Sequence, residues 1–330
     1  MTIGTYPTAV EHLMALSRPG CDLWVKRDDQ THPRYGGNKV RKLEHILGEA
    51  RRRGARRIVT LGAAGSHHVL ATTIHGRAAG FRVAAVLTQQ PCSRHAEDNL
   101  RAGLAAGLEA SPARSWSAVP LVVGRILERT DYFVPPGGTN AMTSVGYANA
   151  VIELSDQIAR GELPAPDVMV AALGSGGTVA GLVAGVCASG LPTRVLAVRV
   201  VQAPLVTRTS TLLLAHAASR AMGRRPTWRE LGEVLEIEDS LLGPGYAWPT
   251  TWGQRAIEVG REHGLPLEAT YTAKAFAGAL RLVEHVAARR VLYWHTLSSA
   301  PMQPLLEGAG SLPEELRSLL LETGQDSGGA

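Results

Sequence analysis

Residues 168–193 read VMVAALGSGGTVAGLVAGVCASGLPT and contain no charged side chain. The run is long enough to span a bilayer, but glycines interrupt it, among them Gly174, Gly176 and Gly177. We interpret it as a buried strand, a glycine loop and a buried helix, an order typical of α/β proteins with parallel sheets. A membrane span is the less favoured interpretation, and we expect no membrane partner.

Outward from this stretch, short apolar or β-branched runs alternate with amphipathic segments of helix length. The predicted strands are 57–61, 83–87, 132–134, 168–172, 195–201 and 291–294. The predicted helices are 38–53, 66–79, 94–106, 141–160 and 273–288. This alternation predicts an α/β fold whose parallel strands are covered by helices on both sides. We expect the polar tail at 323–330 to be disordered.

Length and composition narrow the class of protein. With 330 residues, 45% hydrophobic and 19% charged, the chain is globular and long enough for two cores. Three scattered cysteines suit a reducing cytoplasm, and no signal peptide is visible, so we expect a cytoplasmic protein. The densest basic run, at 51–57, ends a predicted helix and has no interleaved aromatic residues, so we expect no nucleic-acid partner. No histidine pair has metal-ligand spacing, so we predict no metal site.

The glycine loop Gly174-Ser175-Gly176-Gly177-Thr178 lies between the buried strand and the buried helix. Backbone N–H groups at such a turn, together with the positive end of the helix dipole, form a phosphate cradle. Close packing alone is the alternative explanation. A dinucleotide fold would place a third glycine where Val179 stands and a carboxylate at the end of the next strand, and both are absent. No Gly-Lys-Ser/Thr of a P-loop is present either. The loop therefore favours a phosphate that is not part of a nucleotide.

The stretch Gly36-Gly37-Asn38-Lys39 places a lysine one residue after a helix N-cap. The positive end of the helix dipole disfavours its ammonium form and favours the neutral amine that a Schiff base needs. A surface lysine on an amphipathic helix is the alternative. Lys42 lies one turn further along, so both side chains could face one anionic ligand.

Several separated motifs, taken together, resemble the D-cysteine desulfhydrase and 1-aminocyclopropane-1-carboxylate deaminase family of fold-type II pyridoxal-phosphate enzymes. These motifs are KRDD at 26–29, GGNKVRKLE at 36–44, PGGTN at 136–140, GSGGT at 174–178, GY at 245–246, YTAKA at 271–275 and HT at 295–296. The resemblance runs from residue 6 to about residue 305. It implies two open, twisted, mostly parallel sheets flanked by helices. It also implies a large cofactor-binding domain (1–40 and 151–330), a small domain (41–150), a cofactor in the cleft between them, and a homodimer.

The resemblance assigns roles to individual residues. Lys39 would carry pyridoxal 5'-phosphate as a Schiff base and move protons at the substrate carbon. Lys42, Ser175, Gly176, Gly177 and Thr178 would hold the cofactor phosphate, and Asn38 and Gly174 are further cofactor-binding residues. Tyr246 and Tyr271 would lie beside the ring or the substrate, Thr296 at the pyridine nitrogen, and Ser66 at the substrate carboxylate or amine.

A threonine at the pyridine nitrogen favours elimination. The Thr296 hydroxyl can hydrogen-bond a neutral ring nitrogen but cannot hold its proton, and an unprotonated ring is a weaker electron sink. Relatives that open the cyclopropane ring carry Tyr-Glu where this chain has Tyr271-Thr272. We therefore expect D-cysteine desulfhydrase-like β-elimination on a small amino acid, giving ammonia and a 2-oxo acid. Deamination, β-replacement, retro-aldol cleavage and a non-catalytic binding protein on the same fold are the alternatives.

Two departures from the family pattern leave the substrate open. His67 stands where the family has an asparagine that hydrogen-bonds the phenolic oxygen of the cofactor. We expect the imidazole to take this role; the alternative is that another group makes this hydrogen bond and His67 only packs. Leu297-Ser298 replaces Gly-Gly, and its side chains are expected to crowd the cofactor end of the pocket. Ser66 is not a hydrolase nucleophile, because Ala64 and His68 stand where the glycines of G-x-S-x-G belong.

Overall fold

The computed structural model describes residues 1–322, so the predicted disorder at 323–330 lies outside the described residues. The chain forms two compact units, unit 1 (1–45 and 138–300) and unit 2 (46–137 and 301–330). Among the described residues, no helix is long and apolar enough to cross a membrane.

Unit 1 is built on a six-stranded sheet in the order β1-β2-β11-β8-β9-β10. Every neighbouring pair is parallel except β1 and β2. The strands are β1 (Val10–His12), β2 (Asp22–Lys26), β8 (Val168–Leu173), β9 (Arg194–Arg199), β10 (Leu235–Glu238) and β11 (Arg290–Trp294). The helices are the first part of α1 (Asn38–Arg52), α5 (Ala141–Ala159), α6 (Gly177–Ser189), α7 (Arg208–Ala221), α8 (Trp228–Val234), α9 (Thr251–Glu262) and α10 (Thr272–Glu284).

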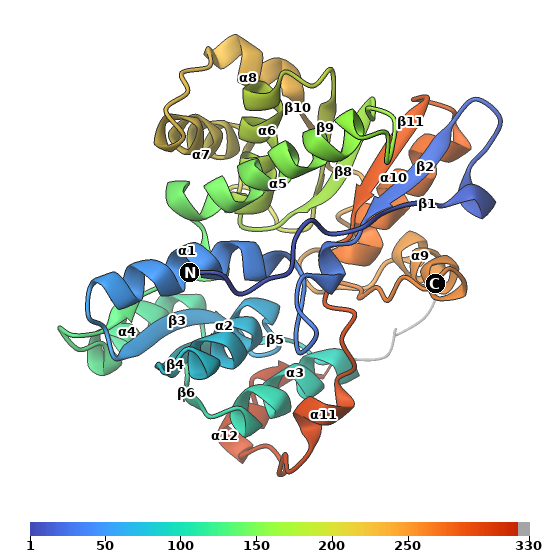
Figure 1. Ribbon diagram of the computed structural model, residues 1–330. Coiled ribbons are helices and arrows are strands. Elements are labelled where there is room, and N and C mark those ends of the chain that lie inside the picture. Colours follow the sequence, from blue (N-terminus) through green and yellow to red (C-terminus); the bar gives the residue numbers. More distant parts are fainter. Residues whose placement is uncertain (323–330) are drawn as a thin grey trace. The chain divides into compact units, whose positions relative to one another are not determined.

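The two faces of this sheet bury separate hydrophobic clusters. On one face, α5 and α6 run side by side (Figure 1) and bury residues such as Tyr147 and Leu182 together with Met169 and Ala171 of β8. On the other face, Phe276 and Ala279 of α10 pack against a cluster that includes Val170. Alternate residues of β8 therefore point into opposite cores, which explains why this strand has no polar position.

Unit 2 contains a four-stranded parallel sheet in the order β6-β4-β3-β7. Its elements are β3 (Arg57–Ala63), α2 (His67–Ala78), β4 (Arg82–Thr88), β5 (Gln90–Pro91), α3 (Arg94–Ala105), β6 (Leu108–Pro112), α4 (Val119–Ile126), β7 (Tyr132–Phe133), α11 (Gln303–Leu306), α12 (Glu314–Arg317) and β12 (Leu320–Leu321). Two open, mostly parallel sheets flanked by helices confirm the predicted fold class.

The unit boundaries differ from the predicted domains, which were 1–40 with 151–330 and 41–150. The segment after residue 300 groups with unit 2 because Leu312, Leu316 and Leu319 are buried in its core, while β12 pairs with β5. The first turns of α5 group with unit 1, since α5 packs along α6. Both differences arise from contacts between residues far apart in the sequence.

Candidate active site

The first turn of α1 follows a tight glycine turn against the end of β11. Gly37 has φ +90°, and a Cβ there would lie 2.5 Å from the Thr296 carbonyl oxygen. The Asn38 N–H donates to that same carbonyl at 3.0 Å. Ser298 adds its hydroxyl, which accepts from the Gly36 N–H at 2.8 Å. Thr296, Asn38 and Lys39 are therefore brought together, and the Ser298 side chain helps to hold the turn before Lys39.

The two lysines of this helix turn are held by neutral groups. Lys39 Nζ donates to Asn38 Oδ1 at 2.8 Å, and Lys42 Nζ donates to Thr139 Oγ1 at 3.2 Å. Burial lowers the pKa of Lys39 to about 8, with Glu268 opposing the shift. Burial and the charge of Lys39 together lower the pKa of Lys42 well below its usual value. Two lysines side by side, with their charged forms disfavoured, are suited to receive an anion, because a nearby negative charge favours the ammonium form of each.

The glycine loop closes around the Lys42 ammonium group. Gly176 adopts φ +85° as the N-cap of α6, a conformation that favours glycine. A Cβ on Gly177 would lie 2.7 Å from Lys42 Nζ and 2.8 Å from Thr139 Oγ1. The Thr139 and Ser175 hydroxyls are 2.6 Å apart. The space that a Gly177 side chain would fill is therefore lined by an ammonium group and hydroxyls at a helix N-terminus.

These groups fit a phosphate ester. The cradle combines the positive end of α6, two lysines and the hydroxyls of Ser175 and Thr139, all of which stabilise or donate to an anion. Asn38 Nδ2 donates to Thr178 Oγ1 at 3.1 Å, which ties the Lys39 turn to the loop. The predicted residues Asn38, Lys39, Lys42 and Gly174–Thr178 thus form one contiguous group at the carboxyl ends of β8 and β11.

Tyr271 and Tyr246 border the same loop. A Cβ on Gly174 would lie 3.0 Å from Tyr271 Cε1, so the ring packs directly on the loop. The Tyr271 hydroxyl donates to the Tyr246 hydroxyl at 2.9 Å, with the rings edge to face. Burial raises the pKa of Tyr246 to about 12 and that of Tyr271 well above its usual value. Both tyrosines are therefore hydroxyl donors at neutral pH.

Two predicted site residues, Ser66 and His67, belong to unit 2 and lie at the start of α2. Ser66 is the N-cap of α2 and accepts from the Val69 N–H at 3.4 Å. His67 Nε2 is 3.0 Å from His95 Nε2, and Asn99 Nδ2 is 3.5 Å from His67 Nδ1. The imidazole expected at the cofactor is thus paired with a second imidazole, from α3. Among residues 1–322, no group of three or more potential metal ligands is found.

Sequence reasoning missed three groups at these sites. Thr139 lies in the PGGTN motif at 136–140, which by itself indicates no role for its hydroxyl, and His95 is 28 residues from His67. Glu268 accepts from the backbone N–H groups of Thr270, Tyr271 and Thr272 at 2.7–2.9 Å, and so fixes the start of α10. Glu268 precedes the N-cap Tyr271, whereas the sequence signal of a helix start is an acidic residue after the N-cap, so no local pattern identified it.

Residues 1–296 match the family model described as "Pyridoxal-phosphate dependent enzyme". Because the match covers most of the chain, the protein belongs to this family of pyridoxal-phosphate enzymes, and its cofactor is pyridoxal phosphate. Within the family, it is a homologue of the 1-aminocyclopropane-1-carboxylate deaminases and D-cysteine desulfhydrases.

Three curated relatives are similar to it over most of their length. A putative 1-aminocyclopropane-1-carboxylate deaminase of Thermotoga maritima is 34% identical over 301 residues, covering 88% of this chain and 93% of the relative. A nocardicin C-9' epimerase of Nocardia uniformis is 34% identical over 303 residues, covering 88% and 90%. A D-cysteine desulfhydrase of Klebsiella pneumoniae is 30% identical over 311 residues, covering 88% and 91%.

The fold agrees with these relatives. The crystal structure of a homologue of 1-aminocyclopropane-1-carboxylate deaminase superposes with a TM-score of 0.78 at 29% identity, covering 96% of this chain and 94% of the other. The predicted family, fold type and cofactor are all confirmed.

Proposed function

We propose that the protein is a pyridoxal-phosphate-dependent lyase that eliminates the β-substituent of a small amino acid, with D-cysteine as the model substrate. The balanced reaction takes cysteine and water to a three-carbon 2-oxo acid, hydrogen sulfide and ammonia. The bound cofactor supplies the electron sink for bond breaking at the substrate Cα. Lys39, Lys42 and the glycine loop would bind it, with Thr296 at the ring nitrogen.

The observation that carries the proposal is that residue 272 is a threonine whose hydroxyl contacts Glu268. Relatives that open the cyclopropane ring have a glutamate at this position, whereas Thr272 here has a hydroxyl 3.2 Å from Glu268 Oε1. The nearby Glu268 carboxylate accepts three backbone N–H groups of the helix start. It is therefore engaged as a cap and is poorly suited to replace the missing glutamate as an acid or base.

The remaining groups divide into a base and an acid. The pKa of about 8 for Lys39 leaves a fraction of neutral amine near neutrality, which can accept the α-proton. Tyr271 donates its hydrogen to Tyr246, so the Tyr246 hydroxyl can give its own hydrogen to a leaving thiolate. Its raised pKa keeps it protonated until that step. Two groups with pKa values set apart by their surroundings are typical of acid–base pairs.

For Ser66 and His67 we propose the roles that the family resemblance implies, at the substrate carboxylate or amine and at the phenolic oxygen of the cofactor. The 3.0 Å contact between His67 Nε2 and His95 Nε2 supports this role, because the second imidazole holds the first in a fixed orientation. We also propose that the protein is a homodimer and that it is cytoplasmic.

The test offers D- and L-cysteine, D- and L-serine and 1-aminocyclopropane-1-carboxylate to the holoenzyme. Sulfide, ammonia and the 2-oxo acid are each quantified. We expect sulfide, ammonia and a three-carbon 2-oxo acid in equal amounts from one cysteine enantiomer. We expect no four-carbon 2-oxo acid from the cyclopropane substrate. Ring opening, or no elimination from either cysteine, would overturn the proposal.

Epimerisation at Cα is a second candidate, favoured by the 34% identity to a nocardicin C-9' epimerase. An epimerase needs one group to remove the α-proton and another to return it from the opposite face, and Lys39 and Tyr246 are two such groups. Solvent deuterium at Cα with loss of optical purity, and without ammonia release, would identify this activity.

A further inference from the structure

The chain has only four lysines among its 34 basic lysine and arginine residues. Lys26, Lys42 and Lys274 are fully buried, and Lys39 is partly buried. Arginine thus supplies nearly all of the positive side-chain charge at the surface, and none of the four lysines is exposed. Lys39 and Lys42 belong to the cofactor cradle, and Lys26 forms an ion pair with Glu153 at 2.6 Å. Lys274 has no role in the site described above.

Lys274 holds backbone carbonyls rather than a carboxylate. Its Nζ donates to the Leu242 carbonyl at 2.7 Å and to the Gly245 carbonyl at 3.0 Å. Burial lowers its pKa to about 8, and the charge of Glu268 opposes the shift. The ammonium form therefore predominates near neutrality, and each of its hydrogen bonds is charge-assisted.

The segment that Lys274 holds is the loop between β10 and α9, which carries Tyr246. Gly243 and Gly245 both have positive φ, +67° and +147°, and a Cβ on Gly245 would lie 1.8 Å from Gln202 Nε2. Gly243 and Pro244 are exposed, whereas Gly245 is buried. The loop therefore turns inward at Gly245, the residue whose carbonyl Lys274 binds, and Tyr246 is the next residue.

Tyr271, whose hydroxyl donates to that of Tyr246, is held at the start of the same helix, α10. Glu268 Oε1 accepts from the Tyr271 N–H at 2.8 Å, which sets the backbone of Tyr271 at the start of α10. Lys274 lies three positions after Tyr271, in the first turn of α10, and Glu268 lies three positions before Tyr271, so the two anchors flank the start of one helix. One anchor sets Tyr271 and the other sets the loop of Tyr246, and the two hydroxyls meet at 2.9 Å.

We propose that Lys274 is a positioning residue for the reaction: its ammonium group binds the Leu242 and Gly245 carbonyls and so keeps the Tyr246 hydroxyl against that of Tyr271. The inference rests on the proposed function, in which Tyr246 donates a proton. A compact ammonium group can reach two carbonyls inside a helix–loop contact, whereas a planar guanidinium group is larger and forked. An apolar residue of the same length would leave both carbonyls without this donor.

A double-mutant cycle tests the inference on the holoenzyme, with Lys274→Met, Tyr246→Phe and the double variant. We expect each single change to lower kcat at least tenfold with KM changed less than about threefold. If Lys274 acts through Tyr246, adding Lys274→Met to Tyr246→Phe should lower kcat by less than about threefold more. Multiplication of the two single effects would overturn the inference.

The matched control is Arg281→Met. Arg281 lies on the same helix and donates to Ser240 Oγ, in the same loop, at 2.8 Å. This hydrogen bond is exposed, and Ser240 lies six positions before Tyr246, so kcat should not change. An equal loss of kcat in Arg281→Met would show that any weakening of the loop is sufficient, and would contradict a specific role for Lys274.

Hydrogen–deuterium exchange of the peptide spanning 241–249 gives a readout without turnover. Exchange should accelerate in Lys274→Met but not in Tyr246→Phe or Arg281→Met, and unchanged exchange in Lys274→Met would overturn the inference. If the wild type turns over no amino acid, the proposed function fails while this readout still tests the loop contact. If Lys274→Met does not fold, Lys274→Gln is measured by the same criteria.

Discussion

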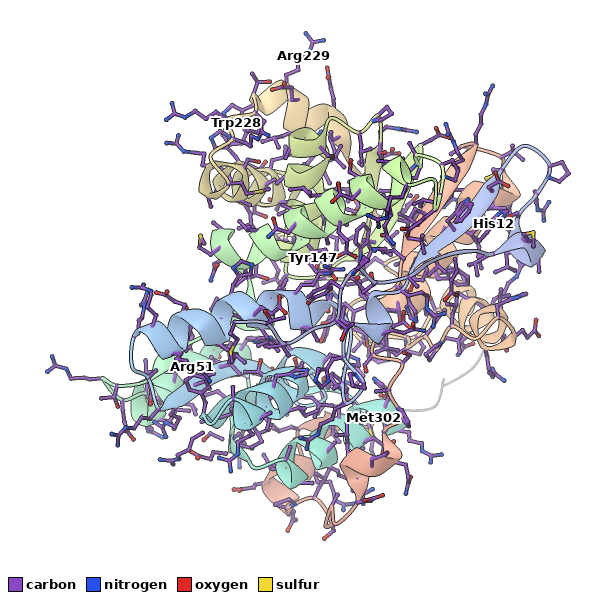
Figure 2. All side chains as sticks on the ribbon, viewed as in Figure 1. His12, Arg51, Tyr147, Trp228, Arg229 and Met302 are labelled. Atoms are coloured by element: carbon purple, nitrogen blue, oxygen red, sulfur yellow. The ribbon has the colours of Figure 1, made fainter. Side chains whose placement is uncertain are left out.

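Helix α1 contributes basic side chains to two buried groups that differ in their hydrogen-bond partners: carboxylates in the first and neutral oxygens in the second. In the first, Arg41 donates to Asp28 through Nε and Nη2 at 2.9 and 2.8 Å and to Glu153 through Nη1 at 2.9 Å. Tyr147, labelled beside α5 in Figure 2, and Trp294 each donate to Asp28 at 2.8 Å. Burial alone would raise the pKa of Asp28, but Arg41, Lys26 and the hydrogen bond from Trp294 together outweigh it and lower the pKa to about 2.

The second group consists of Lys39 and Lys42. Their hydrogen bonds to Asn38 and Thr139 are made to neutral oxygens, and burial shifts the pKa of each lysine downward. Cations in the first group are neutralised by carboxylates of the chain itself, whereas those in the second face a glycine loop. The contrast indicates that the first group stabilises the fold and that the second accepts an anionic ligand.

The largest effect is expected from Asp28→Asn, which keeps the shape of the side chain and removes its charge. Arg41 would lose its fully buried partner, so the free energy of unfolding should fall by ~3–5 kcal/mol. Denaturant unfolding of the cofactor-free protein measures it. The control is Asp22→Asn, at a half-exposed carboxylate 3.4 Å from His12, where a change within ~0.5 kcal/mol is expected.

The pH dependence of Asp28 has a definite sign. Its pKa is lower in the folded protein than the unfolded value of 3.8, so its contribution is complete above pH 3.8 and is lost as the pH falls toward about 2. A loss below ~1 kcal/mol in Asp28→Asn would contradict the assignment of this group to stability.

Lys42→Met is expected to lower cofactor affinity instead of stability, and its effect in free energy should be smaller than that of Asp28→Asn. Removing a buried cation next to Lys39 should leave the stability of the cofactor-free protein unchanged or increase it. Cofactor affinity should fall ~10–100-fold, since a charged hydrogen bond to the phosphate is lost. Equilibrium dialysis with pyridoxal phosphate measures it. Lys26→Met is the matched control, because it should lower stability and leave affinity unchanged. The reverse pattern in the two variants would invalidate the comparison.

The extent to which sequence predicts this structure depends on how far apart the contacting residues lie. The glycine loop and the strands β3, β4, β8 and β11 follow from local patterns, and the structure places them as predicted. Asn38, predicted as the N-cap of α1, is instead the first residue of that helix. Contacts between distant segments leave no local pattern, as with the Asp28–Trp294 hydrogen bond across 266 positions and the pairing of β12 with β5.

The same reason explains the missed site residues. Lys274 was visible only as part of a motif, because its partners Leu242 and Gly245 lie about 30 positions away in a loop.

Helix α10 ends at Glu284, earlier than the predicted 288, since the chain turns at Val286 with φ +47°. That residue is β-branched and gives no sign of a left-handed turn.

The assignment of the cofactor to Lys39 is tested most directly by reducing the holoenzyme with borohydride and mapping the modified peptide. Four lysines in the chain make the result unambiguous. We predict that pyridoxyl label appears on Lys39 alone, and that Lys39→Ala takes up no label while retaining reversible cofactor binding through Lys42 and the glycine loop. Label on Lys26, Lys42 or Lys274, or undiminished labelling of Lys39→Ala, would contradict the assignment.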